Sequence, residues 1–289
     1  MCDELTAADN HVYLTGISRR RFGAITGAAG LSLALSAPAD AKVIASRDVS
    51  ITTPDGKADA YFVAPSAGKH PGVLIWPDIM GLRPAFRQMA DRLAQSGYAV
   101  LVVNQFYRST KAPFLAPGEA FDQPEVRAKI APFTKALSPD GTTRDATAFI
   151  GFLDAQPQVD KTRGLASTGY CMGGPMVFRT AAAVPGRVRA GATFHGGGLV
   201  TDQPTSPHLL IPSMKAQYLI AIAANDDARA PTDKDALRAA FATAKLSAEI
   251  EVYAGTMHGW CPPDSKVYNP AQADRAWERM IALFEKTLA

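Results

Sequence analysis

The sequence predicts an α/β fold, with a mostly parallel sheet covered by helices on both faces. Two observations support this prediction. First, runs such as 72–76 and 98–103 are continuously apolar, which is typical of strands buried on both sides. Second, such runs alternate with stretches of helical spacing, such as 86–95. Since 47% of the 289 residues are hydrophobic, the chain can bury a core of the required size.

The expected elements follow one another in a regular order. Two alternating strands joined by a turn come first, and buried strands then alternate with helices to the end of the chain. The stretch 104–144 is long and weakly periodic, and we expect a functional cap segment there. The expected strands are 48–52, 58–65, 72–76, 98–103, 164–168, 189–194, 217–223 and 248–253. The expected helices are 86–95, 145–153, 175–183, 232–245 and 270–288.

The first 41 residues resemble a twin-arginine signal peptide. Three arginines at 19–21 precede a run rich in glycine and alanine at 23–37, and small residues offer cleavage after Ala39 or Ala41. This resemblance implies recognition by the twin-arginine export machinery and a periplasmic location. An anchored or disordered tail is the alternative. The apolar run is too short and too rich in glycine to predict a stable membrane span.

Composition argues against several classes of function. We expect one domain at 42–289, and its balance of charges offers no basic patch for nucleic acid, since the whole chain carries a net charge of only +3. Three cysteines are too few for a disulfide framework, and no cluster of histidine and cysteine has metal-binding spacing. We therefore expect no metal and no cofactor, and a small molecule as the partner.

The clearest chemical signal is the sequence Gly-Tyr-Cys-Met-Gly-Gly at 169–174, between an expected strand and an expected helix. It is the cysteine form of the nucleophile elbow G-x-S-x-G. A strained backbone would lift Cys171 clear of the sheet, and glycines are needed on either side because the chain passes close to itself there. The N–H of Met172, at the helix N-terminus, could stabilise an oxyanion. A buried structural cysteine is the alternative reading of Cys171.

Polar side chains follow the ends of six expected strands. Because the carboxyl ends of parallel strands share one edge of a sheet, where ligands bind, we expect a site at that edge. A thiol nucleophile needs a base, and the base needs an acid that orients it. Taken singly, Asp226 could be a helix N-cap and His258 an ordinary loop histidine. The six side chains are Asp78, Arg108, Cys171, His195, Asp226 and His258.

The order of Cys171, Asp226 and His258 is nucleophile, acid and base, as in α/β-hydrolases. With these residues the chain resembles the dienelactone hydrolase family over nearly all of the part after the signal. The resemblance implies the α/β-hydrolase fold and the cleavage of carboxylic esters or lactones. The matching motifs are 77–81, 106–108, 169–174, 225–226 and 257–259.

The resemblance also implies a role for each matching residue. Cys171 would be the nucleophile, His258 the base and Asp226 the residue that orients the base. The backbone N–H groups of Met172 and Ile79 would form the oxyanion hole.

The resemblance also concerns positions that contact the thiol or the substrate, and at two positions the chain differs from the family. Asp78 stands where the family usually has a glutamate that interacts with the thiol, and Arg108 stands where an arginine binds the substrate carboxylate. Pro262 replaces a second such arginine, and Lys266 is the nearest cation. His195 either lines the acyl pocket or caps the glycine loop that follows it.

The mechanism that follows is two-step acyl transfer, through a thioester on Cys171. One alternative is a general carboxylesterase or other acyl hydrolase on the same fold. Another is a non-catalytic periplasmic binding or redox protein. Cys261 is expected to be a packed bystander thiol, with a redox bridge to Cys171 as the alternative.

Overall fold

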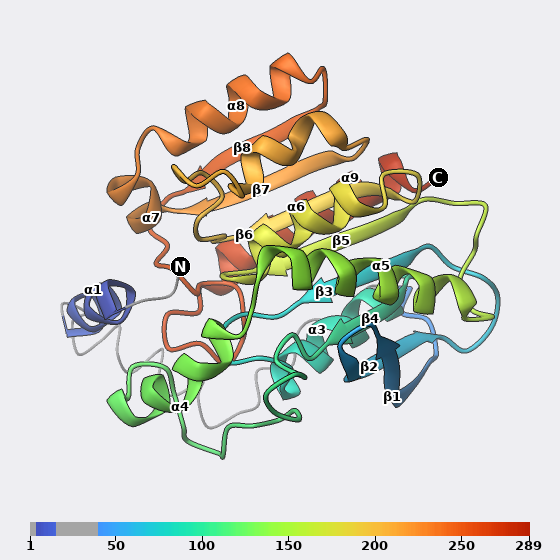
Figure 1. The fold of residues 1–289 in the computed structure, drawn as a ribbon, viewed down its shortest axis with the longest axis horizontal. Helices are drawn as coiled ribbons and strands as arrows, with labels where there is room; N and C mark the ends of the chain where they lie inside the picture. Colours follow the sequence, from blue (N-terminus) through green and yellow to red (C-terminus); the bar gives the residue numbers. More distant parts are fainter. Residues whose placement is uncertain (1–3, 16–39) are drawn as a thin grey trace.

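The fold is built on a single mixed sheet of eight strands, in the order β1-β2-β4-β3-β5-β6-β7-β8 (Figure 1). The computed structural model describes residues 4–15 and 40–289. Strand β2 runs antiparallel to both of its neighbours, and the remaining neighbours pair in parallel. The strands are β1 (Ile44–Thr53), β2 (Gly56–Pro65), β3 (Gly72–Trp76), β4 (Ala99–Val103), β5 (Leu165–Tyr170), β6 (Val188–Phe194), β7 (Gln217–Ala223) and β8 (Ala248–Tyr253).

Helices cover both faces of this sheet, which confirms the predicted fold class. Helices α5, α6 and α8 contribute to the hydrophobic core on one face, and α3 and α9 to the core on the other. The helices are α1 (Glu4–Thr15), α3 (Pro84–Gln95), α4 (Pro124–Lys135), α5 (Pro139–Ala155), α6 (Gly173–Ala183), α7 (Ala224–Arg229), α8 (Asp233–Thr243) and α9 (Pro270–Thr287), with a 3₁₀ helix at Pro207–Ser213.

Local sequence explains why these elements form where they do. Every residue of β3 and of β4 is buried, as the apolar runs predict. Helix α9 buries Ala276, Met280 and Phe284, which lie four residues apart and therefore share one face. Its N-terminus is capped by Asn269, whose side chain accepts a hydrogen bond from the N–H of Gln272 at 3.2 Å.

The stretch 104–144 contains more helix than its pattern predicts. Helix α4 lies wholly inside it, and α5 begins at Pro139 rather than near residue 145. The side chains of Val126 and Ile130 on α4 pack against Ile79, just after β3. Pro132 interrupts the helical pattern inside α4, which is why periodicity missed it.

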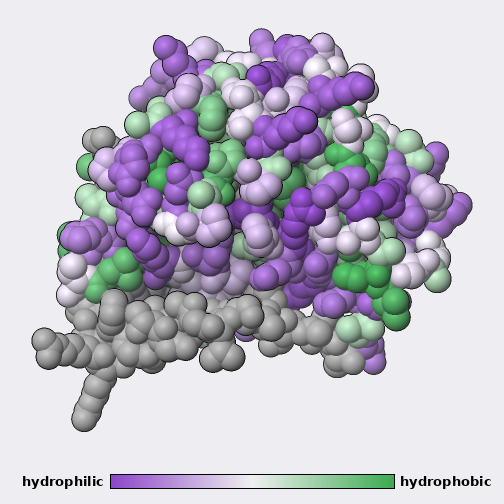
Figure 2. All heavy atoms as spheres, turned by 90° about the horizontal axis from the view of Figure 1, so that it is seen from below, coloured by the Kyte–Doolittle hydropathy of each residue, from purple (hydrophilic) through white to green (hydrophobic). Residues whose placement is uncertain are grey.

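The N-terminal part of the chain is described only in pieces. The twin-arginine motif at 19–21 and the run 23–37 lie outside the described residues. Within the expected signal, however, residues 4–15 form the helix α1. Across the described parts of the chain, no helix is both long and apolar enough to cross a bilayer. Figure 2 shows a face on which hydrophilic residues are interspersed with smaller hydrophobic groups.

A strained turn joins β5 to α6, as the elbow motif predicts. Cys171 has a φ of 54°, in the left-handed region that side chains other than glycine rarely adopt. A Cβ on Gly169 would lie 2.3 Å from the carbonyl oxygen of Gly173, and one on Gly173 would lie 2.3 Å from that of Trp76. The turn therefore excludes every side chain at both positions.

The Gly169→Ala substitution should destabilise the protein by about 2–3 kcal/mol, because the new methyl group meets backbone that cannot move aside. Urea unfolding measures this change. Gly186→Ala is the control, since a Cβ at Gly186 meets no atom within 4 Å. Equal unfolding midpoints for the two variants would contradict the close approach at the elbow.

Candidate active site

Asp226 and His258 come from neighbouring strand ends and form a hydrogen-bonded pair. Asp226 lies on α7, directly after β7, and His258 lies on the loop after β8. Oδ2 of Asp226 is 2.8 Å from Nδ1 of His258. Because a carboxylate accepts hydrogen bonds, Nδ1 carries the proton in this pair, and Nε2 is the nitrogen that could act as a base.

Asn225 fixes the backbone beneath this pair. Its Oδ1 accepts a hydrogen bond from the N–H of His258 at 2.8 Å. Thr256 adds a second tie, since its hydroxyl donates to the carbonyl of Tyr253 and accepts from the N–H of Ala224. The two loops are thus held together on both sides of the pair. The sequence shows Asn225 only as part of a motif, because its role depends on a contact between two loops.

One cavity contains the side chains of Cys171, His195 and His258. The rest of its lining comes from α1, from the loop after β3, from residues 120–122 before α4 and from the loop after His258. The other lining residues are Thr6, Ala7, Asn10, His11, Leu14, Asp78, Ile79, Met80, Arg83, Ala120, Phe121, Asp122, Gly259, Asp264, Ser265, Lys266 and Val267.

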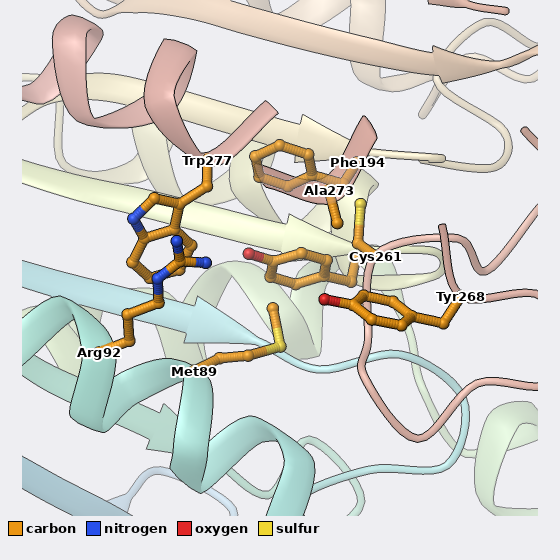
Figure 3. Close-up of a pocket in the computed structure, with 8 residues that line it drawn as sticks. Met89, Arg92, Phe194, Cys261, Tyr268, Ala273 and Trp277 are labelled. Atoms are coloured by element: carbon orange, nitrogen blue, oxygen red, sulfur yellow. The ribbon is translucent and has the colours of Figure 1, made fainter. Parts of the chain in front are cut away.

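The two described cysteines lie in different chemical states and different places. Cys171 is almost fully buried, lines this cavity and takes part in a disulfide bond. Cys261 is a free buried thiol, so the two do not pair with each other. Figure 3 shows Cys261 in a second, smaller pocket, near Phe194 and Tyr268. Burial raises the pKa of the Cys261 thiol well above its usual value, which disfavours its thiolate form.

Asp78 is engaged by an arginine that sequence analysis missed. Its two carboxylate oxygens accept from Nη1 and Nη2 of Arg83 at 2.7 and 2.9 Å, and Oδ1 also accepts from the N–H of Met80. Arg83 turns its other edge to Asp264, donating from Nε at 2.6 Å and from Nη2 at 2.9 Å. Burial alone would lower the pKa of Arg83, but the charges of Asp78 and Asp264 outweigh burial and raise it.

The resemblance implies that Arg108 binds a substrate carboxylate, whereas in the structure its guanidinium contacts aspartate side chains of the protein. Its guanidinium donates to both oxygens of Asp145 at 2.7 and 2.8 Å, and to Asp55 at 2.5 Å. It is not one of the described residues that line the cavity. The arginine that does reach the cavity is Arg83, five positions after Asp78.

His195 is buried in the cavity wall without a hydrogen-bond partner. It is 1% exposed, and neither ring nitrogen bonds to any described part of the chain. Its ring lies edge-to-face against His258, with centroids 4.9 Å apart. Burial, and next the neighbouring His258, lower the pKa of His195 well below its usual value of 6.5. The imidazole is therefore neutral at neutral pH.

The described residues contain no group of three or more histidine, cysteine, aspartate or glutamate side chains placed to hold a metal ion. The arrangement that they do provide is a sulfur, a carboxylate-oriented imidazole and a second, neutral imidazole around one cavity.

Comparison with known proteins identifies the family. A model of the dienelactone hydrolase family matches residues 58–288 of the chain. The chain belongs to this family. It is a hydrolase of the α/β type, and it falls among the carboxylic ester hydrolases.

Individual relatives of this hydrolase have related names. A Synechocystis sp. protein provisionally named carboxymethylenebutenolidase is 25% identical over 244 residues, which cover 83% of this chain and 96% of that protein. A carboxymethylenebutenolidase of Pseudomonas putida is 27% identical over 169 residues, which cover 57% of this chain and 67% of that protein.

Solved structures are similar in fold. The structure of a Klebsiella pneumoniae protein, provisionally described as a dienelactone hydrolase, has a TM-score of 0.73 at 24% identity and covers 85% of this chain and 100% of its own. A dienelactone hydrolase-like promiscuous phosphotriesterase from metagenomic libraries has a TM-score of 0.69 at 22% identity. At these sequence identities the similarity shows a shared fold.

The neutral His195 should make the stability of this hydrolase depend on pH. Below its ordinary pKa of 6.5 the unfolded chain binds a proton that the folded chain refuses, so stability falls as the pH drops from about 7.5 to about 5.5. Each pH unit below the ordinary value costs up to about 1.4 kcal/mol. His195→Asn should flatten this slope in urea unfolding, and asparagine tolerates the φ of 42° found there. Equal slopes in the wild type and in His195→Asn would contradict a neutral buried ring.

Proposed function

We propose that this hydrolase cleaves carboxylic esters or lactones by two-step acyl transfer, with Cys171 as nucleophile, His258 as base and Asp226 as the residue that orients the base. The observation that supports this most is that Cys171 and His258 line one cavity, and that His258 is hydrogen-bonded to Asp226. The three come from the ends of different strands, where sheets of this type build their sites.

In the first step the Cys171 thiolate attacks the carbonyl carbon, after His258 has taken the thiol proton on Nε2. The negative charge that develops on the carbonyl oxygen is stabilised by the N–H groups of Met172 and Ile79. Met172 directly precedes α6, where the helix dipole adds to this stabilisation. The carbon–oxygen bond then breaks, and the alcohol or enol leaves with the proton that His258 returns.

In the second step His258 takes a proton from water, and the resulting hydroxide attacks the thioester. The carboxylic acid leaves and Cys171 is restored as a thiol, with His258 returning the proton to sulfur. A thiolate is itself a good leaving group, so the first intermediate returns to substrate unless the alcohol departs easily. Activated esters and enol lactones are therefore favoured over plain alkyl esters.

The proposal predicts that hydrolysis of p-nitrophenyl acetate requires a reductant and Cys171. A sulfur held in a disulfide cannot attack a carbonyl, so activity should rise when dithiothreitol is added. In the reduced protein, Cys171→Ala and His258→Ala should each lower kcat by about 10³-fold or more. The release of p-nitrophenolate measures the rate.

The control variant is Cys261→Ala, which removes the free thiol outside the cavity. It should keep its rate within about threefold of the wild type, because Cys261 lines a different pocket from Cys171 and His258. Undiminished turnover in reduced Cys171→Ala would refute the cysteine mechanism. Loss of activity in Cys261→Ala, with folding intact, would point to the wrong thiol.

A further inference from the structure

The charges around the cavity bear on the substrate of the proposed reaction, so this inference rests on the proposed function. We propose that the cavity selects uncharged esters or lactones, and that Asp264 is a residue that determines this preference.

Arg83 is the buried cation of the cavity, and two carboxylates hold it. Asp78 bonds to one edge of its guanidinium and Asp264 to another, through four hydrogen bonds of 2.6 to 2.9 Å between side chains. The side chain of Arg83 is only 9% exposed, so water screens these contacts little. The three groups together carry a net charge of −1, and the donors of Arg83 are committed to them.

Among the described lining residues Lys266 is the second cation, and it is also paired. Its Nζ is 2.6 Å from Oδ2 of Asp122, which lies across the rim of the cavity. The carboxylates and cations of the described lining therefore sum to −1, since Asp78, Asp122 and Asp264 face Arg83 and Lys266. A substrate carboxylate would enter a negative field, whereas an uncharged ester would not.

Arg108 does not change this balance. Its guanidinium is held by the buried Asp145 and by Asp55, and it stands outside the described lining. Four residues after His258 the chain has the uncharged Pro262. Arg108 therefore brings no free positive charge to the described lining.

His195 offers the cavity a partner suited to an uncharged polar group. Its two ring nitrogens are buried and bond to no described residue, although the ring lies in the wall beside His258. Burial and His258 hold its pKa low, so the ring stays neutral, with one nitrogen as donor and the other as acceptor. A neutral carbonyl or ether oxygen satisfies such a donor without bringing a charge into the cavity.

The test compares two p-nitrophenyl esters whose acyl chains have the same length: the neutral valerate and the monoanionic hydrogen glutarate. With the reduced full-length chain, kcat/KM should favour the valerate by about 10-fold or more, and the ratio should shrink in high salt. An equal or higher kcat/KM for the glutarate overturns the inference and leaves the proposed function standing. If neither ester is hydrolysed, the proposed function fails and this inference fails with it.

Asp264→Asn then tests the residue itself, because it removes one of the two carboxylates on Arg83. The ratio of kcat/KM values should shift at least 5-fold toward the anionic ester. Asp122→Asn at the exposed rim should shift the ratio in the same direction by a smaller factor. This variant tests the role of the carboxylates if Asp264→Asn fails to fold. Asp274→Asn is the matched control, because Asp274 pairs with Arg92 away from this cavity and should leave the ratio unchanged. Identical ratios in wild type, Asp264→Asn and Asp122→Asn overturn the role of these carboxylates.

Discussion

The structure depends on one close approach, where the backbone of the turn after β5 meets the end of β3. Gly173 lies so near the carbonyl of Trp76 that no side chain fits between them. This contact brings the residues after the two strands together, since Cys171 follows β5 and both Asp78 and Ile79 follow β3. The positive φ of Cys171 is tolerated because β5 and α6 hold both sides of the turn. Strain at one residue thus sets the geometry of the site.

A second constraint is the Arg83 ion-pair group. Asp264 is 181 residues away from Arg83 in sequence, so the group ties the start of α3 to the loop that follows His258. Buried ion pairs add little to stability on balance, because burying the charges costs about as much as pairing them returns. Losing one partner is costly, however, since it leaves a buried charge uncompensated. The group is therefore better understood as fixing the position of loops around the cavity than as strengthening the fold.

Features of the molecule that depend on neighbouring residues in the sequence could be predicted from local patterns. The sheet was predictable, because buried strands such as β3 and β4 are apolar throughout. The elbow was predictable as well, because its steric demands restrict residues within a few positions of Cys171. The order of residues in the chain pointed to Asp226 and His258, and Oδ2 of Asp226 lies 2.8 Å from Nδ1 of His258. The catalytic roles of the two residues stay a prediction. Helix α4 was missed because Pro132 lies inside it and only Val126 and Ile130 are buried.

The residues that escaped prediction share one property, which is dependence on distant partners. Arg83 reads as an ordinary polar residue before a helix until Asp264 is placed beside it. Arg108 matched a family motif by position, yet Asp55 and Asp145 decide what its guanidinium contacts. A motif fixes where a backbone segment lies, but the direction of a long side chain depends on neighbours that the local sequence does not contain.

Helix α1 is part of the wall of the cavity that contains Cys171, so the N-terminal segment affects the shape of that cavity. Its Asn10 donates to the carbonyl of His258 at 3.2 Å, its Asp9 accepts from Asn225 and Arg229, and it forms part of the cavity wall. A chain that began after the expected signal would lack this wall and would present a wider opening over the same chemical groups. The full-length and shortened forms would then differ in the size of molecule they admit, so measurements made on one would not describe the other.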